Sequence, residues 1–385
     1  MTKVAFVVQR CGTEVGGGAE NLCLKIAQHM AQHWEVEILT TCALDYMTWE
    51  NHYPVGVEVI KGAKVRRFRV SQKRNVKAFN RLSEKLAPRL KTASLEEQET
   101  WMKTQGPLST DLIDFVSKHH NDYDAFIFFG YLYATTYFIL PLVAEKAYLE
   151  PLAHDEWTIY MTMWDEFFKK PRGFIFNTPE EKSFIQKRFP HLGIDGPVIG
   201  VGVEPPDSYN AERFRQKYNI RDPFLLYIGR IDPSKGCQEL FDYFIYLRSQ
   251  ESQPRKLVLL GKSVMTIPEH PDIIALGFVD EQTKWDALAA CDLLVMPSPY
   301  ESLSIVLLEA WTMGKAVLVN GRCDVLVGQC RRANGGLWYC DREEFTVCLE
   351  VINGVLKKKM GNQGDSHVKS SYLWSKVIAQ FSEKI

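Results

Sequence analysis

The stretch LLVMPSPYESLSIVLLEAW, residues 293–311, contains the pattern of one strand, one loop and one helix. Its first residues form a short apolar run, its centre is marked by prolines, and a helix is predicted from about Ser302. Two acids, Glu301 and Glu309, lie eight positions apart in this apolar sequence. An amphipathic helix with one acid at each end explains the pattern without any function. A functional explanation depends on the rest of the chain.

The same alternation of short apolar runs and helical stretches continues along most of the chain. Stretches of helical length, such as 19–33 and 237–250, separate most of the runs. Strands that alternate with helices predict an α/β architecture with parallel sheets. The runs of strand length are 4–9, 35–41, 125–129, 173–177, 224–229, 256–261, 273–277, 293–297 and 316–320.

A break between two such series lies at residues 195–208, where three prolines and three glycines gather. We expect a domain boundary near residue 200, with an N-terminal domain over 1–199 and a second domain that begins at residue 200. Each domain is long enough for a doubly wound, Rossmann-like sheet. Such sheets bind ligands beyond the carboxyl ends of their strands, so a cleft between two of them suits two substrates.

The composition is that of a globular protein. The 385 residues are 46% hydrophobic and 24% charged, and 46 bases against 47 acids give a net charge of -1. This balance gives no argument for nucleic acid as a partner. Nine cysteines without a C-x-x-C pair predict a reducing, cytoplasmic location, and their spacings match no common zinc site. No metal is expected.

Two segments bear on membrane insertion. Residues 1–10 lack a long apolar region and a cleavage site, so they are predicted to be a first strand and not a signal peptide. Residues 125–144 carry no charge over twenty positions, which is long enough to span a bilayer. Gly130 and Pro141 interrupt this stretch, so a buried strand followed by a buried helix is the preferred interpretation.

A local excess of positive charge lies in residues 61–91. Twelve bases and a single acid, Glu84, give this segment a charge of +11. A solvated face is the ordinary explanation of such a run. The alternatives are an acidic-glycan or lipid-diphosphate acceptor, or an anionic membrane surface, and we expect peripheral contact with the inner membrane face. The bases are Lys61, Lys64, Arg66, Arg67, Arg69, Lys73, Arg74, Lys77, Arg81, Lys85, Arg89 and Lys91.

Three segments have the chemistry of an anion site. Gly16, Gly17 and Gly18 follow the first strand and open a helix, which allows close backbone approach and favours a phosphate. This loop is not a complete dinucleotide fingerprint, and a glycine-rich turn without a ligand is the alternative. In GRIDPSKG, Arg230 and Lys235 follow Gly229 at the end of a strand, and together they suit a diphosphate. Two exposed bases on a loop are the alternative.

The third anion segment is the loop of the opening stretch. A helix from Ser302 would leave the N–H groups of Leu303, Ser304 and Ile305 free to bind phosphate oxygens. Glu301 would repel a phosphate, so sugar hydroxyls are its expected partners. Glu309 would lie roughly 12 Å further along the helix axis, which matches the span from a transferred sugar across a diphosphate to a ribose.

The ordered set of these motifs resembles family 4 of the GT-B glycosyltransferases. The resemblance is carried by E-x7-E after a strand and P-S-x-x-E, by the upstream G-R-x-x-x-x-K-G segment and by the glycine-rich first loop. HDEW at 154–157 resembles the active-site histidine that follows the fourth strand of the first domain. ALGFVD at 275–280 resembles the base-contacting segment, and NGGLWY at 334–339 resembles a late loop. The end of the chain resembles a helix that returns to the first domain, which implies domains of 1–199 with 371–385, and 200–370.

The resemblance implies a GT-B fold and a retaining transfer of a hexose from a nucleotide diphosphate sugar, a UDP-sugar such as UDP-glucose, to a saccharide or lipid-linked glycan. It implies no cofactor and no obligatory metal. Arg230 and Lys235 would hold the diphosphate, and His154 would lie near the anomeric centre. Glu301 would bind the donor sugar and Glu309 the ribose. The glycine loop would approach the donor phosphates or the acceptor, and the backbone at Phe278 would read the base.

Two departures from the family pattern bear on donor choice. Arg322 and Asp324 stand where the family tends to have small residues and Pro-Glu, and Ser302 replaces a frequent glycine. The alternatives to a transferase are a binding protein that holds a nucleotide sugar without turnover and a sugar phosphorylase on the same fold. The sequence leaves open the sugar, base, acceptor, linkage and oligomeric state.

Overall fold

The structure is a computed structural model that describes residues 2–250 and 254–385. The chain divides into two compact units, of which the first comprises Met1–Val201 together with Ile378–Ile385 and the second comprises Gly202–Val377. Helix α15 (Trp374–Lys384) contributes residues to both units. The first unit resumes at Ile378, where residue 371 was expected. Tyr372 and Trp374 remain in the second unit, since the Val203 N–H donates to the Tyr372 carbonyl and a Cβ on Gly202 would lie 2.3 Å from the Trp374 ring.

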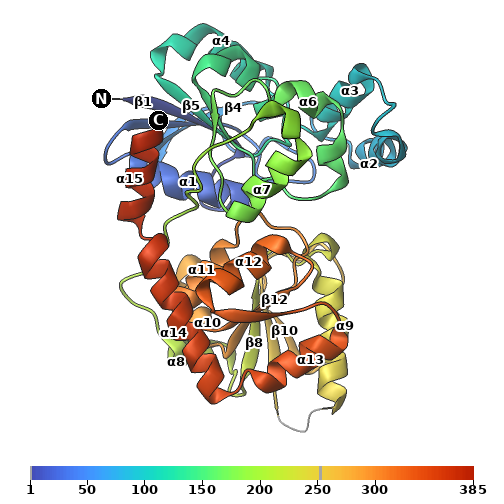
Figure 1. The fold of residues 1–385 in the computed structure, drawn as a ribbon, viewed down its shortest axis with the longest axis vertical. Coiled ribbons are helices and arrows are strands. Elements are labelled where there is room, and N and C mark those ends of the chain that lie inside the picture. The colour runs from blue at the N-terminus through green and yellow to red at the C-terminus, as the bar shows by residue number, and fades with distance from the viewer. Residues whose placement is uncertain (1, 251–253) are drawn as a thin grey trace. The chain divides into compact units, whose positions relative to one another are not determined.

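The first unit contains a seven-stranded sheet in the order β3-β4-β2-β1-β5-β6-β7 (Figure 1). All neighbouring strands are parallel except the edge pair β3–β4. The strands are β1 (Lys3–Arg10), β2 (Glu35–Thr41), β3 (Gly56–Ile60), β4 (Ala63–Phe68), β5 (Ala125–Phe129), β6 (Ala147–Glu150) and β7 (Gly173–Phe174). The helices are α1 (Gly18–Met30), α2 (Val76–Leu86), α3 (Leu95–Gln105), α4 (Thr110–His119), α5 (Ala134–Tyr137), α6 (Met163–Phe167) and α7 (Pro179–Arg188).

The core of this unit explains the uncharged stretch 125–144. Every residue of β5 is buried, because β5 lies between β1 and β6 inside the sheet. The predicted strand is confirmed, but the helix after it is only the four-residue α5, followed by a 3-10 segment, Leu140–Lys146. Pro141 ends the regular helix, since proline removes a backbone donor. Among the described residues, no helix combines the length and hydropathy needed to cross a bilayer.

The fold brings acids to the basic segment 61–91 that a count along the sequence leaves out. Glu37 on β2 pairs with both Lys64 and Arg66 of the neighbouring β4, and the buried Arg67 pairs with Glu58 on β3. Two further ion pairs are Lys73 with Glu50 and Arg89 with Glu97. Five of the twelve bases thus have carboxylate partners outside the segment, which weakens the charge argument for a membrane surface. Peripheral membrane contact and a cytoplasmic location stay predictions.

The second unit contains a six-stranded sheet in the order β10-β9-β8-β11-β12-β13, and all of its strand pairs are parallel. Its strands are β8 (Phe224–Ile228), β9 (Lys256–Leu260), β10 (Ile273–Ala275), β11 (Leu293–Met296), β12 (Val317–Asn320) and β13 (Gly336–Tyr339). Its helices are α8 (Ala211–Tyr218), α9 (Cys237–Gln250), α10 (Glu281–Ala290), α11 (Ile305–Thr312), α12 (Asp324–Ala333), α13 (Arg342–Val351) and α14 (Gly354–Ser371).

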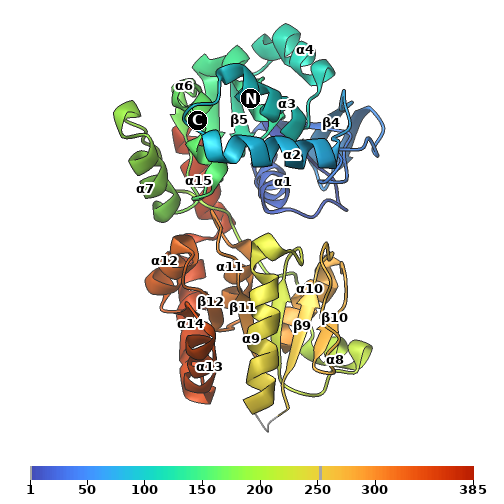
Figure 2. The same ribbon diagram turned by 90° about the vertical axis from the view of Figure 1, so that its right-hand side faces the viewer.

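Helices cover both faces of this second sheet. Helices α9 and α13 share a core with alternate residues of β8, β9 and β11, such as Leu225, Leu257 and Val295. Helices α11 and α14 pack against each other by the opposite face, as Figures 1 and 2 show. The strand order reverses between β8 and β11, which is the position where doubly wound sheets bind ligands. The segment 334–339, expected to be a loop, is mostly the edge strand β13.

Candidate functional site

The loops after β8 and β11 meet at the carboxyl edge of the second sheet. Gly236 ends the turn that carries Lys235 and has a positive φ of 73°. A Cβ at Gly236 would lie 2.2 Å from the carbonyl oxygen of Pro297, in the loop after β11. Only glycine allows the two loops to approach so closely. This contact places Lys235 beside Glu301.

Lys235 and Glu301 form an ion pair at this edge, with 2.8 Å between Nζ and Oε1. Their side chains keep 33% and 15% of their surface exposed, so a ligand can reach both. The structure thus brings together two residues, 66 positions apart, that the sequence assigned to neighbouring parts of one donor. A cation that is adjacent to a carboxylate can bind a phosphate while the carboxylate accepts hydrogen bonds from hydroxyl groups.

Arg230 is held in place by Asp232, with 2.8 Å between Nε and Oδ2. The other oxygen of Asp232 accepts from the backbone N–H of Ser234 at 2.8 Å, which begins the turn that carries Lys235. Burial would raise the pKa of Asp232, but the bonds from Ser234 and the charge of Arg230 outweigh it and lower the pKa. Asp232 therefore stays ionised and links the two cations, a role that sequence analysis missed.

The helix of the opening stretch begins at Ile305 and not near Ser302. Ser304 is its N-cap, and its hydroxyl accepts from the N–H of Leu307 at 3.3 Å. The N–H of Ser304 donates to the Gln329 side chain at 3.4 Å, so it is not free as expected. Residues 301–304 are a loop that places Glu301 ahead of the helix. The helical spacing assumed between Glu301 and Glu309 is therefore wrong.

Glu309 is almost completely buried, with 1% of its side chain exposed. Its Oε1 pairs with the Nζ of Lys284, from α10, at 2.8 Å. The same Nζ lies 2.8 Å from Glu281. Sequence analysis missed Lys284, because nothing in the sequence pattern relates α10 to the E-x7-E segment.

The loops after β8, β9 and β10 are also tightly joined. A Cβ on Gly261 would lie 1.9 Å from the carbonyl oxygen of Gly229, so these two strand ends touch through their backbones. The N–H of Gly261 donates to the Gly277 carbonyl at 2.7 Å, which positions the segment expected to read a base. Phe278, in that segment, has 63% of its surface exposed.

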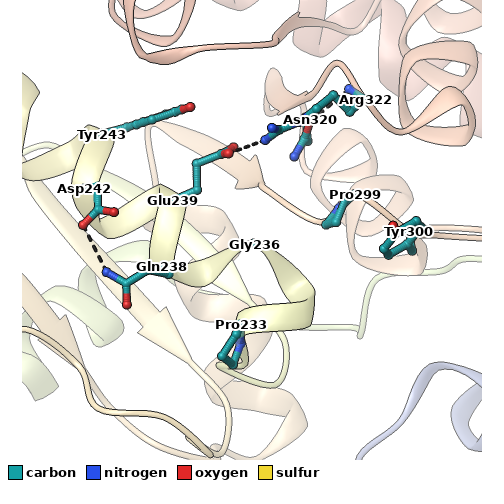
Figure 3. A pocket seen from close by; sticks show the side chains of 10 residues that line it. All are labelled: Pro233, Gly236, Gln238, Glu239, Asp242, Tyr243, Pro299, Tyr300, Asn320 and Arg322. Carbon is teal, nitrogen blue, oxygen red and sulfur yellow. Dashed lines mark hydrogen bonds and ion pairs between the residues drawn. The ribbon is translucent and has the colours of Figure 1, made fainter. Parts of the chain in front are cut away.

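A shallow hollow (Figure 3) is lined by Gly236 and Tyr300, which neighbour Lys235 and Glu301 along the chain. Its walls come from the first two turns of α9 and from the loops after β11 and β12. Arg322, which departs from the family pattern, pairs here with Glu239 across the hollow. Its backbone N–H donates to Asn320 at 2.9 Å, and Asn320 in turn donates to the Pro297 carbonyl at 2.8 Å. The hollow is lined by Pro233, Gly236, Gln238, Glu239, Asp242, Tyr243, Pro299, Tyr300, Asn320 and Arg322.

In the first unit, the glycine loop is occupied by charges of the chain itself. Arg10 and Glu20 form an ion pair of 2.5 Å with 6% and 5% of their side chains exposed. Arg10 also donates to the carbonyls of Gly16 and Leu44, at 3.1 and 2.7 Å. A Cβ on Gly17 would lie 2.1 Å from a Glu20 oxygen. A carboxylate therefore already lies at the positive N-terminus of α1, beside Gly17, whereas a Cβ on Gly18 would meet nothing within 4 Å.

His154 lies in the loop after β6, where the Glu156 N–H donates to its carbonyl at 2.9 Å. Its Nδ1 is 3.4 Å from Oε1 of Glu156, and 29% of the side chain is exposed. β6 is the sixth strand along the chain and not the fourth, because sequence analysis missed β3, β4 and β6 itself.

A buried acid, Glu181, holds the backbone next to His154 in place. Glu181 accepts from the backbone N–H groups of Ala153 and Asn177 at 2.8 and 2.9 Å. Burial raises its pKa to about 7. The neighbouring Glu150 accepts from the Asn177 side chain at 2.8 Å, and burial raises its pKa well above the ordinary value. These acids fix the loop geometry.

Comparison with known proteins finds partial likenesses to glycosyltransferases. Residues 210–339 match the family model for glycosyl transferases group 1. An uncharacterized glycosyltransferase of Methanocaldococcus jannaschii is 23% identical over 221 residues, which is 54% of each chain. The lipopolysaccharide 1,2-N-acetylglucosaminetransferase of Salmonella typhimurium is 26% identical over 227 residues, 53% of this chain and 59% of that protein. The chain thus spans little more than half the length of these curated relatives.

Solved structures extend the likeness over the whole chain. The sucrose-phosphate synthase of Thermosynechococcus elongatus has a TM-score of 0.74 at 15% identity, covering 100% of this chain and 98% of that chain. Anabaena HepE, in complex with UDP and glucose, has a TM-score of 0.67 at 16% identity, covering 100% and 99%. At these identities the likeness concerns the fold. The chain therefore has the GT-B fold of glycosyltransferase structures, and its residues 210–339 match the family model for glycosyl transferases group 1.

Proposed function

We propose that this chain is a retaining glycosyltransferase that moves a hexose from a UDP-sugar to a saccharide or lipid-linked acceptor, without an obligatory metal. One observation carries the proposal: Lys235 and Glu301 meet at the topological switch point of a sheet that lies in the glycosyl transferases group 1 domain. The choice of UDP is supported by the UDP in the HepE structure. The choice of acceptor is supported by the Salmonella relative and by a Campylobacter jejuni relative whose name includes diphospho-undecaprenol.

The chemistry follows from the charges at the edge of the sheet. Transfer breaks the bond between the anomeric carbon and the diphosphate, so negative charge grows on the leaving phosphate. Lys235 and Arg230 stabilise that charge, and such preorganised stabilisation is commonly the largest single contribution to catalysis. Glu301 accepts hydrogen bonds from hydroxyls of the sugar. Glu309 serves the ribose side of the donor.

Nucleotide release from a panel of UDP-, GDP- and ADP-sugars, with and without glycan acceptors, tests the proposal. We expect release from UDP-sugars by the wild type and a loss of at least a hundredfold in Glu301→Gln. Glu343→Gln is the matched control, because Glu343 is 65% exposed on α13. Equal release by Glu301→Gln would contradict the proposal. Tight nucleotide binding without release with any acceptor would favour a binding protein, and release of sugar phosphate in the presence of inorganic phosphate would favour a phosphorylase.

A further inference from the structure

The hollow of Figure 3 opens at the carboxyl edge of the second sheet, between α9 and the loops after β11 and β12. Its volume is about 650 Å³, which lies within the range of known ligand pockets. In the part of the chain that the structure describes, its lining does not include the four residues assigned to the donor, Arg230, Lys235, Glu301 and Glu309. The hollow is therefore a separate candidate site that the proposed donor contacts do not explain.

Contacts across and behind the hollow hold its walls in place. Arg322, in the loop after β12, pairs with Glu239 in the first turn of α9. The side-chain oxygen of Asn320 accepts from the backbone N–H and from Nε of Arg322, at 2.9 and 3.3 Å. In the loop after β11, the Ser298 hydroxyl donates to the Tyr300 carbonyl at 2.9 Å. Walls that are already ordered reduce the entropy cost of binding a ligand.

The charges of the lining favour a ligand with hydroxyl groups. One guanidinium and two carboxylates belong to the lining, those of Arg322, Glu239 and Asp242. Oδ1 of Asp242 accepts from the Gln238 amide at 3.0 Å, and among the described residues no basic side chain pairs with this carboxylate. An ionised phosphate, which only accepts hydrogen bonds, would be repelled by Asp242, and an ammonium, which only donates, would be repelled by Arg322. A hydroxyl can donate to the carboxylate and accept from the guanidinium.

Aromatic rings supply an apolar surface beside these polar groups. Tyr300 has 41% of its surface exposed, and Tyr243 lies on the α9 wall. The Tyr243 ring packs edge-on against Tyr339 with 6.0 Å between ring centroids, and it lies 5.9 Å from the ring of Phe345, so its orientation is fixed. A pyranose ring has apolar C–H faces and hydroxyls around its edge. It therefore matches a hollow that combines ring faces with fixed hydrogen-bonding groups.

We propose that this hollow is a saccharide site, which holds a neutral sugar unit of the acceptor. The polar side chains of α9 bind its hydroxyls, and Tyr300 packs against its ring. The hollow shares two loops with the proposed donor contacts, because Gly236 follows Lys235 and Tyr300 precedes Glu301. The assignment of the sugar to the acceptor rests on the proposed function, whereas saccharide binding does not depend on it.

Titration with neutral trisaccharides, followed by saturation-transfer NMR, tests the proposal. The probes are maltotriose, chitotriose and galactotriose, each with and without saturating UDP. We expect at least one of them to bind the wild type in the millimolar range, and to bind equally well when UDP is present. The octyl glycoside of that trisaccharide should bind with the same affinity, because the glycan and not a lipid makes the contact.

Variants of the α9 wall and of Tyr300 locate the bound trisaccharide. Gln238→Ala/Asp242→Ala removes hydrogen-bonding groups of the hollow while alanine preserves the helix, and it should weaken trisaccharide binding by about tenfold. Asp365→Ala/Lys369→Ala is the matched control: it removes an i,i+4 pair of α14, with 2.6 Å between Nζ and Oδ2, and should leave binding within about twofold of wild type. Tyr300→Ala should lose binding and Tyr300→Phe should retain it, because the ring makes the contact.

Three outcomes would overturn the saccharide site: no binding by any of the three trisaccharides, binding that UDP displaces, and binding that only the octyl glycoside shows. Wild-type affinity in Gln238→Ala/Asp242→Ala would overturn it as well, and so would a Tyr300→Phe variant as impaired as Tyr300→Ala. Trisaccharide binding without nucleotide release from any donor would instead contradict the proposed function and leave the saccharide site in place.

Discussion

Each unit has an ion pair at the carboxyl end of its sheet, and the two pairs differ in exposure. In the first unit, Arg10, the last residue of β1, and Glu20 on α1 are buried against each other, with 6% and 5% exposure. In the second unit, Lys235 after β8 and Glu301 after β11 form an ion pair with 33% and 15% exposure. The first pair fastens the glycine loop before α1, whereas the second pair leaves both charged groups accessible to a ligand. The same kind of ion pair is therefore buried in one unit and partly exposed in the other, and ligand binding by the exposed pair stays a proposal.

Replacing Arg10 tests whether the buried Arg10–Glu20 pair stabilises the fold. Arg10→Met leaves Glu20 buried without its cation and removes the donors to Gly16 and Leu44. We expect a loss of about 3–5 kcal/mol in the free energy of unfolding, measured by urea denaturation. Lys3→Met is the control, because the Lys3–Glu35 pair is exposed and should contribute about 1 kcal/mol or less. Equal losses in both variants would remove the distinction between the two pairs.

Replacing Lys235 tests whether the exposed Lys235–Glu301 pair serves activity and not stability. Lys235→Met should lower nucleotide release by about a hundredfold to a thousandfold, as for the loss of one stabilising donor. The unfolding free energy should change by about 1 kcal/mol or less, because the pair is partly solvated. Lys169→Met, which removes an exposed lysine of the first unit, should change neither quantity. A large loss of stability with full activity would assign Lys235 to structure.

The buried acids of the first unit should make its stability depend on pH. The pKa of Glu181 is raised from 4.5 to about 7, so the folded chain holds this proton over a range where the unfolded chain releases it. The contribution of Glu181 to stability therefore falls as pH rises from about 4.5 to 7, by about 3 kcal/mol in all, and levels off above that range. Urea denaturation across this range, compared with Glu150→Gln, measures the effect. A slope of the opposite sign would mean that Glu181 is ionised in the folded chain.

The smallest effect on stability is expected for the exposed Arg322–Glu239 pair. Arg322 pairs with Glu239, but 51% of the Arg322 side chain is exposed. Arg322→Ala should lower stability by about 0.5 kcal/mol, since exposed pairs contribute little. Its effect on the KM of a panel of UDP-sugars shows whether the hollow beside Glu301 takes part in donor choice. A stability loss above about 2 kcal/mol would mean that Arg322 has a structural role like that of the buried Arg10.

The sequence predicted the class of fold because hydrophobic periodicity is local. All nine expected strands are present, and α9 begins and ends as predicted at Cys237 and Gln250. The missed strands include β4, which carries Arg66 and Arg67, and the edge strand β13. β4, AKVRRF, mixes charges with apolar residues and so lacks a continuous apolar run, whereas β13, GLWY, is only four residues long and was assigned to a loop by resemblance.

The site was predictable only as far as its motifs extend. Arg230, Lys235 and Glu301 stand in recognisable segments, and the sheet order explains why they converge. Lys284, Asp232 and Glu20 could not be assigned, because their roles depend on neighbours that the fold selects. The start of α11 was misplaced because two serines, Ser302 and Ser304, are both acceptable N-caps. In the structure, the Ser304 hydroxyl accepts from the N–H of Leu307 in the first turn of the helix.

The division of the first unit has a consequence for how the chain is made. Val201 and Ile378 belong to one compact unit, yet the 176 residues of 202–377 separate them along the chain. At about 5–20 residues per second, a ribosome needs about 10–35 s to translate that interval. Throughout this time the first unit lacks residues 378–385, which include the buried Phe381. The unit translated first is therefore completed last, and the nascent chain must keep an unfinished hydrophobic surface from aggregating until residues 378–385 arrive.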